Sequence, residues 1–104
     1  MEKMRKLSEV IPLRIPANQI TPEALQGVAF KLVRGEVVAT PLGMYCDFTI
    51  VTEEDGREYT LRLPYDGYRH TIVFKLYDGP LGPATIVRQT DVNNNPYWLL
   101  TDVE

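Results

Sequence analysis

The 104-residue chain has few of the side chains that carry chemistry: one cysteine, Cys46, one histidine, His70, and a single serine. A lone cysteine cannot form an intramolecular disulfide, and one cysteine with one histidine is too few for the usual zinc sites. There is no Ser-based triad, no phosphate-cradling glycine loop and no HExxH or CxxC spacing. We therefore expect a protein that is not an enzyme and that uses no metal and no cofactor.

Long apolar runs are also missing. None approaches the roughly 20 residues that cross a bilayer, and the charged residues 1–6 are not followed by the apolar stretch of a secretory signal. The lone cysteine suits a reducing compartment. These features predict a cytoplasmic protein with no membrane partner.

An excess of positive charge is the third absence. Eleven Lys and Arg against fourteen Asp and Glu give a net charge of −3, which argues against bulk electrostatic coating of duplex DNA. Five of the acidic residues lie in two places, the 53–55 turn and the C-terminus, so a local basic surface stays open. With 44% hydrophobic and 24% charged residues, the composition is that of an ordinary globular domain.

The domain organisation follows from where periodicity begins. Residues 1–9 lack it and are predicted to be a flexible tail, and residues 10–104 a single β-barrel domain. Residues 10–16 alternate apolar residues with two prolines, which allows an edge strand or an extended arm. Thr21, Pro22 and Glu23 carry the signals that start a short helix, and Gly27 can end it.

Apolar alternation with a period of two then dominates. It starts at Val28 and changes phase near Gly35, where a bulge or sharp bend is expected. The Asp55-Gly56 pair predicts a hairpin between residues 45–52 and 57–63. Residues 71–77 are interpreted as a strand with Ile72, Phe74 and Leu76 inward. The fold class predicted is all-β: a small antiparallel five-stranded barrel with one short N-terminal helix and an extended N-terminal arm.

Part of this pattern resembles the first three strands of an OB-fold, a five-stranded barrel often used to bind single-stranded nucleic acid. The resemblance covers residues 28–63 and rests on these positions: Val33, Gly35, Val37, Phe48, Ile50, Asp55, Gly56, Tyr59, Leu61 and Leu63. It implies an OB-like barrel. One departure is that residues 64–71 are too short and too rich in Gly and Pro for the helix that usually follows the third OB strand.

The candidate site combines outward rings with cations. If Leu99 and Val103 face the interior, Trp98 faces out, and Tyr77 lies opposite the inward Leu76. Exposed rings can stack on unpaired bases while Lys and Arg neutralise phosphates. Arg62 and Lys75 could share one groove with both rings. The full predicted nucleic-acid-binding set is Trp98, Tyr77, Arg62, Lys75, Arg69, Lys31, Arg34, Tyr45, Tyr65 and Tyr68.

Two other interpretations stay open at this point. The rings could cover core edges with the charges as a solvated face. Alternatively, the same surface could bind protein, since Tyr, Trp and Arg dominate interface energetics and the net acidity favours this reading. The arm at residues 10–16 could then add to a neighbour's sheet edge, in a homo-oligomer or with another protein. His70 shows no carboxylate partner in sequence and is interpreted as a loop or barrel-mouth histidine.

Overall fold

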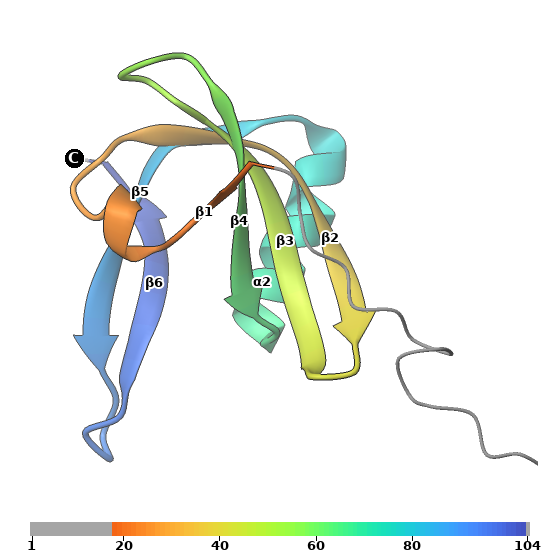
Figure 1. The fold of residues 1–104 in the computed structure, drawn as a ribbon, viewed down its shortest axis with the longest axis vertical. Coiled ribbons are helices and arrows are strands. Elements are labelled where there is room, and N and C mark those ends of the chain that lie inside the picture. Colours follow the sequence, from red (N-terminus) through yellow and green to blue (C-terminus); the bar gives the residue numbers. More distant parts are fainter. Residues whose placement is uncertain (1–17, 104) are drawn as a thin grey trace, which may run out of the picture.

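The computed structural model describes residues 18–103, which form a curved six-stranded sheet with one α-helix (Figure 1). The strand order is β1-β4-β3-β2-β5-β6. The elements in chain order are β1 (Gln19–Ile20), η1 (Glu23–Leu25), β2 (Phe30–Thr40), β3 (Gly43–Thr52), β4 (Glu58–Pro64), α2 (Gly67–Lys75), η2 (Leu76–Asp78), β5 (Leu81–Thr90) and β6 (Pro96–Asp102). The predicted tail and the arm at residues 10–16 lie outside the described residues.

Strands β2, β3 and β4 form the antiparallel meander that the alternation predicts. The register of β2 against β3 shifts between Leu32 and Arg34, so the bulge lies just before Gly35. Ahead of the bulge Phe30 and Leu32 are buried in the core. After it Gly35 and the partly buried Val37 face the core, and Val38 and Thr40 are buried as well. At Gly35 a Cβ would lie 3.1–3.3 Å from side-chain carbons of Phe48, Val73 and Leu76. The missing side chain lets the helix approach the sheet closely.

The β3–β4 hairpin is confirmed and is organised by one carboxylate. Asp55 accepts hydrogen bonds from the Thr52 hydroxyl, from the Arg57 backbone N–H at 2.8 Å and from the Tyr59 hydroxyl at 2.9 Å. Gly56 has a φ of +68°, the left-handed conformation that glycine tolerates at a turn. These donors, led by the Thr52 hydroxyl, hold the pKa of Asp55 below its ordinary value.

The predicted strand at residues 71–77 is wrong, because this segment is helical. The Asp66 carboxylate accepts a hydrogen bond from the Arg69 backbone N–H at 2.7 Å and caps α2, which continues into the single turn η2. Arg69, Val73 and Leu76 are buried at helical spacing. A helix therefore lies between the third and fourth long strands, where the prediction that residues 64–71 are too short and too rich in Gly and Pro for one is wrong.

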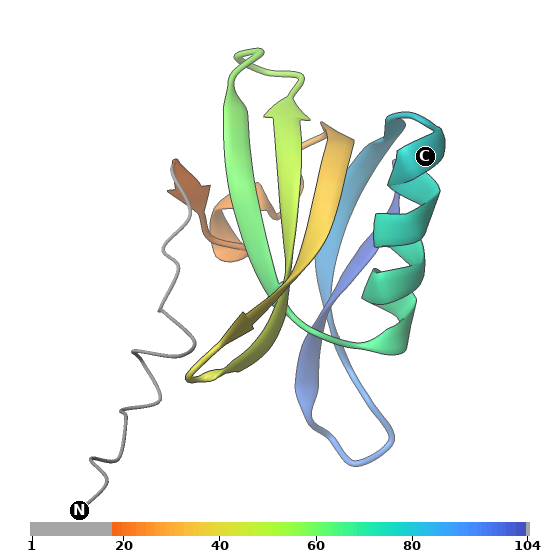
Figure 2. The same ribbon diagram turned by 90° about the vertical axis from the view of Figure 1, so that its right-hand side faces the viewer.

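The sheet curls but stays open within the described residues. Strands β2 and β5 are paired at Phe30–Ala84 and Leu32–Leu81 and then separate (Figure 1). Figure 2 shows α2 running along one side of the molecule, with β3 and β4 on the other side. The core lies between them, and the coarser prediction of a barrel-like, mostly β fold is confirmed while the count of five strands is not.

Further contacts hold the two edges of this curved sheet in place. The edge strand β6 offers the carbonyls of Trp98 and Leu100 to side chains of α2: Arg69 donates to the first at 2.6 Å and the Tyr68 hydroxyl to the second at 3.1 Å. At the other end, β1 pairs in parallel with β4, and a bridge joins Gln26 to Ile86 on β5. Between these points η1 forms as the short predicted helix and buries Leu25 completely.

Candidate binding surface

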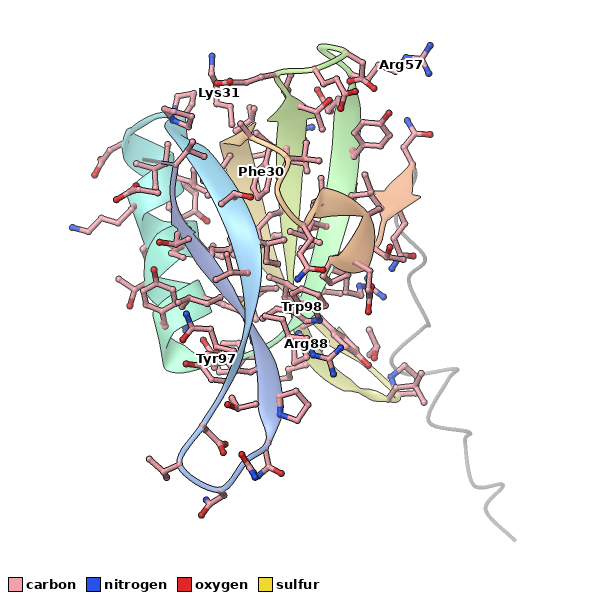
Figure 3. The ribbon with its side chains drawn as sticks, turned by 90° about the vertical axis from the view of Figure 1, so that its left-hand side faces the viewer. Phe30, Lys31, Arg57, Arg88, Tyr97 and Trp98 are labelled. Atoms are coloured by element: carbon pink, nitrogen blue, oxygen red, sulfur yellow. The ribbon has the colours of Figure 1, made fainter. Side chains whose placement is uncertain are left out.

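Trp98 does not face solvent as predicted. It lies opposite Arg88 in the β5–β6 pair and on the same side as Leu100, which is buried opposite Ile86. The indole is half-buried and packs against the core, and the Arg88 guanidinium carbon lies 5.7 Å from the ring centroid. Figure 3 shows the two side chains together on the hairpin. The inward phase of β6 is thus that of Trp98 and Leu100, not of Leu99 and Val103.

Arg62 and Tyr45 lie on the opposite face of the sheet from the core. Arg62 Nε and one terminal nitrogen bind the two oxygens of the buried Asp47 carboxylate at 2.8 and 2.9 Å. This bidentate contact raises the pKa of Arg62 further above its ordinary value. The guanidinium carbon also lies 5.1 Å from the Tyr45 ring centroid. Asp47 therefore holds the Arg62 guanidinium on this face of the sheet. Arg62 does not share a groove with Trp98, because Trp98 packs against the core.

Arg69 is a structural residue. Its side chain, 9% exposed, donates to the Pro64 carbonyl at 2.7 Å as well as to the Trp98 carbonyl, and it lies 3.1 Å from Asp66. It therefore ties the start of α2 to the end of β4 and to β6. A buried guanidinium with these partners is poorly placed to meet a phosphate.

Two further predicted cations lie on β2. Arg34 forms an exposed ion pair with Glu58 at 3.4 Å, a contact that contributes little. Lys31 is exposed, and Figure 3 shows it with Arg57 toward the end of the molecule away from the β5–β6 turn. Lys75, predicted on a strand beside Arg62, lies instead on α2. The predicted groove of Trp98, Tyr77, Arg62 and Lys75 is not formed, because Trp98 packs against the core from β6, Arg62 lies on the opposite face of the sheet, and Lys75 and Tyr77 belong to the α2–η2 segment.

What the structure does bring together is a row of rings along α2 and η2, the aromatic ladder, which consists of Tyr65, His70, Phe74 and Tyr77. Neighbouring ring centroids are 5.3, 4.8 and 6.3 Å apart along this row. His70 and Phe74 are stacked with 14° between their planes, and the Tyr65 hydroxyl hydrogen-bonds His70 Nδ1 at 2.5 Å. The helix turn makes positions 70, 74 and 77 neighbours on one face.

Three of the four ladder rings are exposed. Tyr65 is 38%, Phe74 60% and Tyr77 79% accessible. At about 200 Å² per ring these fractions amount to roughly 350 Å² of aromatic surface. Patches of this size on a single chain often mark interaction sites. Tyr68, also exposed, lies on another side of the helix, where its hydroxyl reaches Leu100.

The segment that carries the ladder has few exposed positive charges. Between residues 65 and 78 the exposed cation is Lys75, because Arg69 is buried, and the two carboxylates are Asp66 and Asp78. The segment that carries the ladder therefore supplies a single exposed cation of its own.

Sequence reasoning missed two ladder members. The interpretations of His70 as a loop or barrel-mouth histidine and of Phe74 as an inward strand residue are both wrong, because both lie on α2, with Phe74 exposed and His70 half-buried. The signal was the spacing of His70, Phe74 and Tyr77 by four and three residues, which is helical. Arg88 was also missed, since its contact with Trp98 depends on strand register.

Other kinds of site gain no support from the described part of the chain. Residues 18–103 contain no group of three His, Cys, Asp or Glu side chains placed to hold a metal ion. Within the same residues no helix combines the length and the apolar character needed to cross a membrane. No family model, no curated protein and no solved structure matches this chain.

Proposed function

We propose that this protein is a binding module that recognises a protein partner through the aromatic ladder of α2 and η2. The observation that carries the proposal is the row of three exposed rings and one half-buried ring along α2 and the residues that flank it, with α2 tied to β4 and β6 by Arg69. Rings fixed in this way lose little conformational freedom on binding, which favours their use as interface anchors.

The charge around the ladder favours protein over nucleic acid. Single-strand binding needs cations along the backbone path as well as rings. One exposed lysine with two carboxylates is a poor match for a chain of phosphates. The stack of His70 on Phe74 also occupies the ring faces between them, which a base would need.

An OB-like architecture is part of the same proposal. The meander β2–β3–β4, the helix α2 after its third strand and the hairpin β5–β6 support it. OB-like barrels serve several kinds of ligand, so the architecture does not itself select nucleic acid. The choice between nucleic acid and protein as the ligand depends on the surface around the aromatic ladder.

The test compares three forms of the full chain: wild type, the double variant Phe74→Ser/Tyr77→Ser, and Leu42→Ser as a matched control. Leu42 is an exposed apolar residue on the β2–β3 turn. A partner retained from cells that make the protein is identified, purified and measured by titration calorimetry. We expect the double variant to bind at least about tenfold more weakly, and Leu42→Ser to bind as wild type does.

The competing class is tested on the same proteins. Oligo-dT and oligo-U are titrated at low salt while amide shifts of residues 65–78 are followed by NMR. No saturable shift is expected. Saturable shifts there, a partner that leaves on nuclease treatment, or equal binding by the double variant would each overturn the proposal.

A further inference from the structure

We infer that the partner docks on the aromatic ladder as a proline-rich segment in the left-handed polyproline conformation. This inference rests on the proposed function and names the chemistry of what its surface takes. The ladder is a row of side chains along the outside of a helix, so it has no free backbone edge to which a strand could add. It offers aromatic surface, and aromatic-lined surfaces are what polyproline segments bind.

The available area fits a short segment and not a folded partner. The rings expose roughly 350 Å², whereas a standard stable interface buries about 800 Å² on each side. A contact this small needs a ligand that loses little conformational freedom on binding. The polyproline helix meets this need, because the pyrrolidine ring fixes φ before binding.

The ring geometry matches the repeat of that helix. The ladder has a tilted pair at each end, with 60° and 50° between the ring planes, and the stack of His70 on Phe74 between them. Each tilted pair leaves an angle in which one prolyl ring can rest. The centroid spacings place these two angles at most about 11 Å apart, close to the roughly 9.3 Å of one three-residue polyproline turn. Prolines three residues apart therefore reach both angles.

A hydrogen-bonding group at the end of the ladder adds to this match. Tyr77 is 79% exposed, and its hydroxyl makes no hydrogen bond within residues 18–103. Proline has no N–H, so a proline-rich segment presents carbonyl oxygens as its backbone polar groups. The Tyr77 hydroxyl can donate to one of them.

The experiment titrates the full chain, labelled with 15N, with a peptide of about ten prolines. We expect saturable shifts of the amides of residues 65–78, with a Kd between about 10 µM and 1 mM, as suits so small a contact. A glycine-serine peptide of the same length, which is flexible, should give no saturable shift.

Variants of the chain test whether the rings themselves are needed. Phe74→Leu/Tyr77→Leu keeps apolar side chains but removes the rings and the hydroxyl, and should bind the proline peptide at least about tenfold more weakly. Tyr97→Leu is the matched control, because Tyr97 is an exposed ring on the opposite face of β6 from Trp98. It should bind as wild type does, and circular dichroism confirms that each variant is folded.

Peptides of one composition test the repeat. Prolines placed three residues apart in a serine chain should bind at least about threefold more tightly than the same prolines placed four apart. Equal binding would overturn the match between one polyproline turn and the two ring angles.

The remaining outcomes separate this inference from the proposed function. If no proline peptide binds wild type, the inference is overturned, and the proposed function stands when a cellular protein partner is still lost from Phe74→Ser/Tyr77→Ser. Shifts outside residues 65–78, or binding that survives Phe74→Leu/Tyr77→Leu, also overturn the inference, since the peptide then binds another surface. If the chain binds neither the peptide nor a protein through the ladder, both proposals fail.

Discussion

Arg69 is the residue whose replacement should reveal most about how α2 is held. Arg69→Met keeps the length and packing of the apolar stem and removes the guanidinium. The change deletes hydrogen bonds to the Pro64 and Trp98 carbonyls and the ion pair with Asp66. Because both carbonyls are partly buried, they lose a charged donor without regaining full contact with water.

The expected cost follows from these contacts. Hydrogen bonds to a charged group contribute about 1.5–3 kcal/mol each, while the pair with half-exposed Asp66 adds little. We expect Arg69→Met to lower the free energy of unfolding by about 3–4 kcal/mol. For a domain of this size that corresponds to a fall in Tm of about 15–20 °C.

The assay is urea unfolding followed by Trp98 fluorescence and by circular dichroism. Lys75→Met, an exposed cation on the same helix, is the control and should change stability by no more than about 0.5 kcal/mol. Arg69→Lys should fall between wild type and Arg69→Met, since an ammonium group cannot span both carbonyls as the planar fork does. A loss below about 1 kcal/mol for Arg69→Met would refute the assignment of Arg69 as the tether of α2.

Three further predictions test the core and the hairpin. Gly35→Ala should destabilise the protein by about 1–2 kcal/mol, because the added Cβ would crowd three core side chains. Gly67→Ala, at the open start of α2, should stabilise it by about 0.5 kcal/mol. Equal melting temperatures for the two variants would contradict this reasoning. The folded-state pKa of Asp55 is depressed, so its contribution to stability is present above the unfolded-state pKa and is lost as pH falls through the folded one. An NMR titration of the carboxyl carbon should therefore show a midpoint below that of an unfolded reference peptide, and a midpoint at or above it would count against the turn geometry. Burial raises the pKa of the Cys46 thiol, so the folded protein should not react with Ellman's reagent at pH 8 until urea unfolds it, and rapid reaction when folded would show that the site is open.

Local signals were strong enough to predict the meander. The strands at 45–52 and 57–63 alternate without interruption, and Asp55-Gly56 supplies the turn between them. The change in apolar alternation near Gly35 can be seen in the sequence. Without a bulge there, the apolar residues after Gly35 would face water. These features depend on neighbours in sequence, so the sequence alone could predict them.

Two errors arose where the sequence supports two patterns at once. In residues 71–77, Ile72, Phe74 and Leu76 alternate as in a strand, while Arg69, Val73 and Leu76 repeat as in a helix. The cap at Asp66 and the space left by Gly35 favour the helix. In β6, apolar residues occupy both phases, so alternation could not choose between Trp98 and Leu99.

The sequence by itself determined the β-rich class, the bulged first strand, the hairpin at Asp55 and the short helical turn before the sheet. The tertiary structure decided the binding surface. Whether a ring points to solvent depends on strand pairing, as for Trp98 opposite Arg88, or on a helix docking against the sheet, as for Phe74. Those contacts join residues far apart in the chain, so no local pattern encodes them, and only the folded structure places the ladder on the surface and Trp98 half-buried against the core.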